Sequence, residues 1–267
     1  MLGLVAMLAI PTSGILVVDG LGVGICQNGT WKALDSIYLD SWPKQTVPTA
    51  SVNKYSMGPS FLMKEDGSIE ETLTGLKFVG DDGEPGGRGW ILDPFIDDRS
   101  MVWFGAKPAA PKVTYLSGNN KVYVDAVKSY LAGKGFKNAK PILTKVAVAD
   151  LDGNGNDEVL IFASSRKIEE MYQALGMMDN KNRNNDYSLA IVRYISGKTV
   201  KTSTMYYSEG RQRGVDGYVF FGGLFQLDGK PGLNIIHRWH GYEAWSATVS
   251  RFSAGKVKDL AESGDGV

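Results

Sequence analysis

The sequence predicts a β-rich α+β protein with a small N-terminal β domain and a C-terminal domain of two antiparallel sheet units that carry one or two helices. Three observations predict this class. Short runs of β-branched and aromatic residues, separated by turn residues, recur along the 267 residues of the chain. Helical periodicity is limited to two segments, 121–132 and 168–175. A stretch rich in proline and alanine, 106–111, divides the chain into two parts.

The chain opens with an apolar segment that has the character of a secretion signal. Met1 to Ile10 is rich in small and apolar residues and is followed by Pro11, but no Lys or Arg precedes it. We expect residues 1–13 to be a signal peptide or the remnant of one, and a first core strand is the alternative. The segment is too short to span a bilayer, which takes about 20 residues. The sequence therefore predicts no transmembrane segment.

Residues 14–107 are expected to form the small N-terminal β domain. The first strand is predicted at Ile15–Val18, and a hairpin pairs residues 23–27 with 30–34 across Asn28-Gly29, a strong hairpin signal. Four tryptophans of this region are typical of a small β core, with a carbohydrate platform as the alternative; they are Trp31, Trp42, Trp90 and Trp103.

A linker at 108–111 leads into the C-terminal domain, 112–267. A helix is predicted from Lys121 to Ala132, capped by Asn119 or Asn120 and ended by Gly133. Alternating or continuous apolar runs predict strands at 142–149, 159–163, 187–195, 199–206, 218–227, 234–240 and 245–252. A last short strand is predicted near Val257.

A run of oxygen-bearing side chains between two of these strands predicts a calcium site. Its side-chain ligands are Asp150, Asp152, Asn154 and Glu158, and the backbone carbonyl of Asn156 completes the set. Gly153 and Gly155 supply the positive φ angles that curl a backbone around an ion. A metal-free turn rich in Asn and Gly is the alternative for the same residues.

This loop is not an EF-hand. That motif needs a bidentate Glu at its twelfth position, in the first turn of a helix. Counted from Asp150, the twelfth position is Ile161, and Val159–Phe162 has the character of a strand. We therefore expect the loop to close at Glu158, inside a strand-loop-strand unit.

The segment Val146–Val159 resembles the FG-GAP/VCBS repeat, the unit of integrin-α-type propellers and of many bacterial secreted proteins. An eroded second copy spans Leu224–Ile236, in which Gln226, Lys230 and Asn234 replace three ligand positions. A lysine at a ligand position indicates that this copy binds no metal. The resemblance implies a Ca²⁺-binding domain over the C-terminal half. That half has length for about two blades, which excludes a closed propeller.

Composition excludes several classes of function. Lys and Arg total 29 and Asp and Glu total 29, so the chain has no net field to attract nucleic acid. The single cysteine, Cys26, excludes an internal disulfide framework, and we expect it to be a buried thiol.

Both histidines lie close together, in His237-Arg238-Trp239-His240, followed by Glu243. Residues three apart in a strand point to opposite faces, so a shared zinc or acid-base site at His237 and His240 is disfavoured. The sequence also lacks a Gly-x-Ser-x-Gly elbow, a P-loop and a His-Glu-x-x-His motif.

The function expected from the sequence is that of a non-catalytic, secreted or envelope-facing bacterial protein. One calcium ion would stabilise its C-terminal domain, and its partner would be a protein or a glycan. The alternative is a secreted hydrolase or carbohydrate-active enzyme with a site in the cleft between the domains, using His237, His240, Glu243 and acids of the N-terminal domain.

Overall fold

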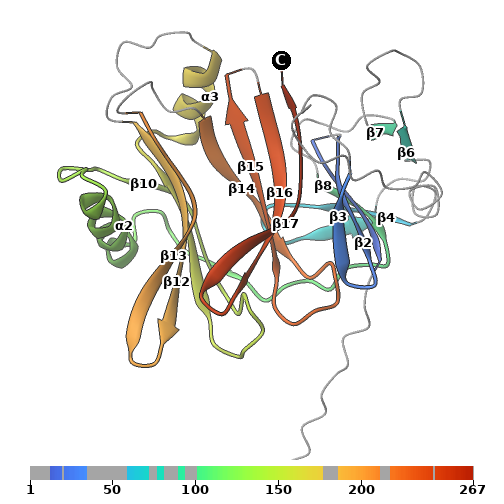
Figure 1. Cartoon of the computed structure of the whole chain (residues 1–267), viewed down its shortest axis with the longest axis horizontal. Helices are drawn as coiled ribbons and strands as arrows, with labels where there is room; N and C mark the ends of the chain where they lie inside the picture. Colours follow the sequence, from blue (N-terminus) through green and yellow to red (C-terminus); the bar gives the residue numbers. More distant parts are fainter. Residues whose placement is uncertain are drawn as a thin grey trace, which may run out of the picture.

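The computed structural model describes residues 13–19, 21–34, 59–71, 77–80, 90–93, 101–176, 186–210, 217–242 and 244–266. These residues form three antiparallel sheets and two helices (Figure 1), so the predicted β-rich α+β class is confirmed, without a closed propeller. Residues 1–12 of the expected signal segment, Trp42 and Glu243 lie outside the described residues.

The N-terminal sheet is built from short strands. In spatial order β5-β4-β8-β1-β2-β7-β6, with β3 paired to β2, they are β1 (Gly14–Val18), β2 (Leu21–Gln27), β3 (Thr30–Ala33), β4 (Ser60–Met63), β5 (Ile69–Glu71), β6 (Lys77–Gly80), β7 (Trp90–Asp93) and β8 (Met101–Gly105). The predicted hairpin is confirmed as β2–β3. Asn28 and Gly29 take φ values of 50° and 74°, as the two central residues of such a turn require.

The C-terminal part forms two sheets. The five-stranded sheet, in the order β13-β12-β11-β10-β9, contains β9 (Thr114–Tyr115), β10 (Ile142–Ala149), β11 (Glu158–Ser164), β12 (Tyr187–Ser196) and β13 (Thr199–Glu209). The four-stranded sheet follows the chain, with β14 (Gly217–Phe225), β15 (Asn234–Gly241), β16 (Ala244–Ser253) and β17 (Lys256–Gly266). The last strand is longer than the short strand expected near Val257. The polar sequence of β17 has no strand pattern, but the strand pairs with β16 along its full length.

Both predicted helices are present. Helix α2 (Lys121–Gly133) is capped by Asn120, whose Oδ1 accepts a hydrogen bond from the Val122 N–H at 3.1 Å. Its buried residues Val127 and Leu131 pack against the outer face of the five-stranded sheet. Helix α3 (Ile168–Gly176) packs instead against β14 of the four-stranded sheet, through a small cluster that includes Met171 and Phe220.

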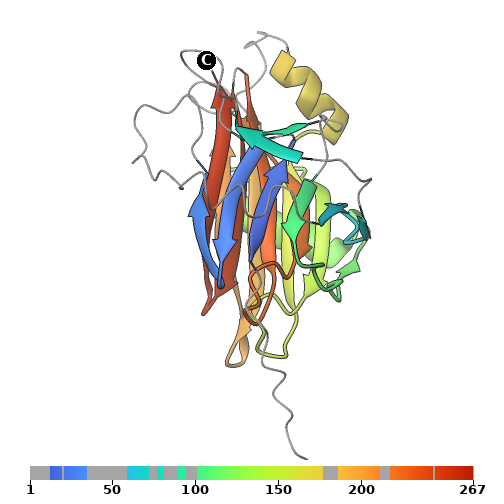
Figure 2. The ribbon, with the colours of Figure 1, turned by 90° about the vertical axis from the view of Figure 1, so that its right-hand side faces the viewer.

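The elements stack in layers. From one side to the other these are α2, the five-stranded sheet, the four-stranded sheet and the N-terminal sheet (Figure 1). Figure 2 shows the same stack from the side of the N-terminal sheet, with the four-stranded sheet behind it. The four-stranded sheet is therefore covered on both faces, and every residue of β14 is buried. This explains why β14 reads as a continuous apolar run rather than an alternating one.

One core joins residues from both sides of the 108–111 linker. Leu16, Trp31 and Trp103 of the N-terminal sheet pack with Phe225 and Ile236 of the four-stranded sheet. Cys26 belongs to this core and is a fully buried thiol, as expected. Burial is the main cause that raises the pKa of this thiol to about 11, so it stays protonated and is a poor nucleophile.

Candidate metal centre

The loop that carries the predicted calcium ligands joins β10 to β11. Ala149 and Glu158, the residues on either side of its turn, are paired in the antiparallel ladder. The chain therefore leaves the loop as a strand and not as a helix, which confirms the strand-loop-strand geometry. Gly153 and Gly155 have φ values of 77° and 87°, the left-handed conformation expected of them.

Three carboxyl groups converge inside this loop. One oxygen from each of Asp150, Asp152 and Glu158 lies within 4.8 Å of the others. Backbone N–H groups fix the first of them, because Asp150 Oδ1 accepts from Gly153 at 2.8 Å and Asp150 Oδ2 accepts from Gly155 at 2.9 Å. The Asn154 N–H donates a second hydrogen bond to Asp150 Oδ1 at 3.0 Å, so Oδ2 is the Asp150 oxygen that keeps a lone pair for a cation.

Glu158 is the buried member of the group, with 3% of its surface exposed. Its Oε2 accepts a hydrogen bond from the Leu151 N–H at 2.9 Å. Its pKa is raised to about 7, first by burial and then by the negative charges of Asp152 and Asp150. A divalent cation among the three groups would remove this repulsion and favour the ionised carboxylate.

The two asparagines lie on the exposed side of the loop. Asn154 Oδ1 accepts hydrogen bonds from both the backbone N–H and the side-chain amide of Asn156, each at 2.8 Å. In this arrangement the Asn154 oxygen is held by Asn156, and it must turn to join a coordination shell. The structure thus brings the three predicted acidic ligands together and pairs the two predicted asparagines with one another.

The residues present fit a hard divalent cation. Among the described residues, no basic side chain forms an ion pair with Asp150, Asp152 or Glu158. All the candidate ligands are oxygen atoms, which suits Ca²⁺ or Mg²⁺ better than zinc or copper. A loop of separate side chains and carbonyls also suits the variable coordination of Ca²⁺ better than the strict octahedron of Mg²⁺.

The second loop, between β14 and β15, repeats the local geometry of the first. Leu227 N–H donates to Asn234 Oδ1 at 3.0 Å, as Leu151 does to Glu158. Lys230 N–H donates to Asp228 Oδ1 at 3.2 Å, at the same loop positions as Asn154 and Asp152. The leucine of each loop is buried, and Gly229 has a φ of 67°.

The charge inside the second loop is balanced by the protein itself. Asp228 is fully buried, and Arg251 of β16 places Nη2 2.5 Å from its Oδ1. The other oxygen accepts from Trp31 Nε1 and Asn234 Nδ2, each at 3.2 Å. A guanidinium therefore neutralises the acid that corresponds to Asp152. In the sequence, Lys230 already indicates that the second loop binds no metal. The role of Arg251 could not be predicted from the repeat pattern, because Arg251 lies outside the repeat.

The two loops touch each other. The Leu233 N–H donates to the Leu151 carbonyl at 3.0 Å. A Cβ atom added to Gly153 would lie 2.5 Å from the Cβ of Pro231, so the first loop has no room there for a side chain. A cation bound beside Asp152 would thus sit next to the contact between the two C-terminal sheets.

The two histidines do not share a site. His237 is buried, and its Nε2 lies 3.0 Å from Ser250 Oγ. His240 lies instead among aromatic rings, with centroids 5.3 Å from Phe220 and 5.8 Å from Tyr172. The Ser250 hydroxyl donates in turn to Asp259 at 2.6 Å, and Ser250 is fully buried.

The fold and this loop define a β-rich α+β protein with an acidic strand-loop-strand turn. Comparisons with protein-family models, with curated proteins and with solved structures found no match. Among the described residues, no helix is long and apolar enough to cross a membrane.

Proposed function

We propose that this protein is a non-catalytic calcium-binding protein in which one Ca²⁺, held by the β10–β11 loop, stabilises the C-terminal sheets. The observation that carries the proposal is the contrast between the two loops. In the first, three carboxyl groups converge with no basic partner among the described residues, whereas Arg251 neutralises the matching acid of the second. Asp150, Asp152 and Glu158 would hold the ion, with Asn154 and the Asn156 carbonyl completing the shell.

The proposal extends to where the protein works. Loops of this type, open to solvent on one side and with three converging acids, suit the modest affinities of extracellular calcium modules, about 0.1–1 mM. Such a site is filled outside the cell, so we place the protein in the extracellular space or the cell envelope. There it would act as a binding or adhesion module for a protein or a glycan.

The test is a thermal melt of the full chain at pH 8, in excess calcium and in excess chelator. A ligand at ten times its dissociation constant stabilises a protein by about 1.4 kcal/mol, which raises the melting temperature by about 3–5 °C for a chain of this size. Asp152→Asn should abolish this difference. Asp157→Asn, an equal charge change at an exposed position of the same loop, should keep it.

Two outcomes would refute the proposal. One is a melting temperature that calcium does not change. The other is an equal loss of the calcium effect in Asp152→Asn and Asp157→Asn, because the effect would then follow the net charge of the loop and not a coordination site. Direct metal analysis of the purified protein gives an independent reading of the bound ion.

A further inference from the structure

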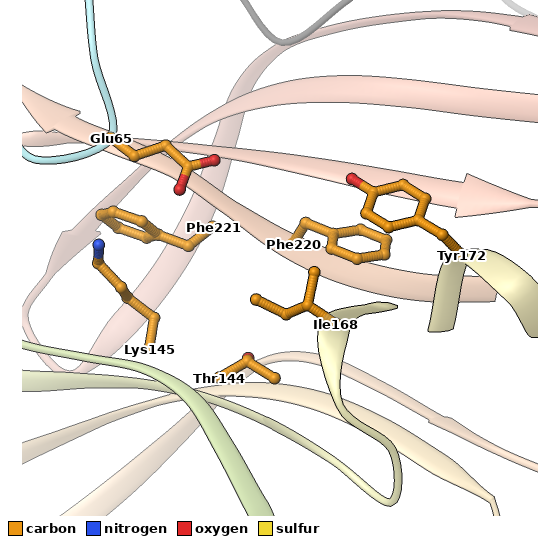
Figure 3. Close-up of a pocket in the computed structure, with 7 residues that line it drawn as sticks. All are labelled: Glu65, Thr144, Lys145, Ile168, Tyr172, Phe220 and Phe221. Carbon is orange, nitrogen blue, oxygen red and sulfur yellow. The ribbon is translucent and has the colours of Figure 1, made fainter. Parts of the chain in front are cut away.

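A cavity of about 110 Å³ lies where β10, β14, α3 and the turn between β4 and β5 meet. Figure 3 shows Glu65 above it and Thr144 and Ile168 below, with aromatic rings between them. Its lining residues are Glu65, Thr144, Lys145, Ile168, Tyr172, Phe220 and Phe221. The cavity is separate from the calcium loop and shares no residue with it, so a ligand could bind here whether or not calcium is bound.

Two β-bulges shape this cavity. The β10–β11 register shifts between Leu143 and Lys145, which leaves Thr144 without a partner in that ladder, and both Thr144 and Lys145 line the space. The β14–β15 register shifts directly after Phe221. Because β14 is also the outer strand of its sheet, Phe220 and Phe221 reach the cavity from opposite faces. Bulges are common next to binding sites, where they redirect side chains.

The aromatic side chains form a rigid wall. Tyr172 of α3 stacks on Phe220, with ring centroids 4.6 Å apart and an angle of 18° between the planes. In Figure 3 the hydroxyl of Tyr172 points over the cavity, toward Glu65. Phe221 lies between the β10 side chains and Glu65, so apolar surface covers the space between the polar groups.

Opposite charges face the cavity without pairing with each other. The Lys145 ammonium lies 4.2 Å from the ring centroid of Tyr115 and 5.0 Å from that of Phe221, and it forms no ion pair with a described carboxylate. Glu65 holds Arg238 through Oε1 at 3.2 Å, and Arg238 also holds Asp19 at 2.9 Å. The Glu65 side chain remains half exposed.

From this juxtaposition we propose that the cavity binds a small zwitterion of the amino-acid class. Lys145 receives its carboxylate, while Glu65 and the aromatic faces receive its ammonium group. A short apolar side chain fills the space against Phe220 and Ile168. The size supports a small ligand, because pockets that enclose drug-sized molecules measure about 300–1,000 Å³. A ligand with only one charge would be matched by either Lys145 or Glu65, but not by both.

Three probes of similar size test the proposal on the full chain by calorimetry and ligand-observed NMR: L-alanine, propionate and isopropylamine. L-alanine should bind, and the two singly charged probes should bind about tenfold more weakly, since each lacks one charge-assisted hydrogen bond. Lys145→Met and Glu65→Gln should each weaken L-alanine binding about tenfold. Lys198→Met, which changes an exposed charge in the β12–β13 turn, should leave it unchanged.

A further variant fills the space without changing charge. Ile168 is partly exposed on α3, so Ile168→Trp should fold normally and abolish L-alanine binding. Equal binding of L-alanine and propionate would overturn the zwitterion in favour of a plain carboxylate site. Equal binding of L-alanine and isopropylamine, no binding of L-alanine, or full binding by Ile168→Trp would overturn the proposal as well.

Discussion

The protonation state of a single residue in this protein depends on its burial as much as on its neighbours in sequence. His237 is a clear case, because its ring is enclosed between the C-terminal sheets and its Nε2 contacts Ser250. Burial lowers its pKa to about 4, and Asp259, on the far side of Ser250, offsets this shift only in part. The imidazole is therefore neutral in the folded protein across the physiological range.

His237 predicts how stability depends on pH. In the unfolded chain a histidine binds a proton below about pH 6.5, whereas the folded protein resists protonation until about pH 4. The unfolded state thus binds more protons between these values, and the free energy of unfolding falls as the pH drops through this window, by on the order of 2–3 kcal/mol. Urea unfolding at several pH values measures the slope, which should be shallower in His237→Gln. The same slope in both proteins would show that other groups cause it.

At the scale of elements, the β10–β11 loop and the β14–β15 loop share one backbone geometry but balance their negative charge in different ways. In both loops a leucine is buried and a glycine has a positive φ. The N–H of that leucine donates a hydrogen bond to the side chain at the ninth loop position, which is Glu158 in the first loop and Asn234 in the second. The two loops differ in how the negative charge of the acid at the third loop position is balanced. Asp152 remains available to a cation from solution, while Asp228 is paired to Arg251.

The pair of Asp228 and Arg251 predicts a coupled effect on stability. Arg251→Met leaves a buried carboxylate without its cation, which costs about 3–5 kcal/mol. Adding Asp228→Asn removes that charge, so the double variant should be more stable than the sum of the two single effects predicts. Urea denaturation of the wild type, the two single variants and the double variant measures this coupling. Strictly additive losses would mean that the ion pair carries no net interaction.

At the scale of the whole molecule, the central fact is that the four-stranded sheet has no free face. The N-terminal sheet covers one side of it and the five-stranded sheet covers the other. The expected linker at 108–111 connects two parts that share a core. Ala109, inside that linker, even forms a β-bridge with Gln226 at the start of the second loop.

This layering predicts the behaviour of a fragment. Residues 112–267, expressed alone, expose the face of the four-stranded sheet that carries Phe225, Ile236 and Val249. We expect this fragment to bind a hydrophobic dye and to melt without a sharp transition, whereas the full chain melts cooperatively. Dye fluorescence and calorimetry make the comparison. A fragment that melts as sharply as the full chain would show that the two parts fold independently.

Much of the local structure could be predicted from the sequence. The Asn28-Gly29 hairpin, the Asn120 cap and the strand that leaves the loop at Glu158 each depend on a few consecutive residues. The convergence of Asp150, Asp152 and Glu158 arises from spacing in the same way. The length of β17 could not be predicted, because hydrogen bonds to β16 order a polar segment that has no strand pattern of its own.

The order of residues along the chain accounts for the β-rich class, the turns and the acidic loop, since these arise from dihedral preferences and from contacts within about ten residues. The packing of the sheets was needed to establish which layers stack, that Arg251 balances Asp228, and that Lys145 and Glu65 face one cavity. These contacts join residues far apart in the chain. Their positions depend on how whole apolar faces pack, which no local pattern records.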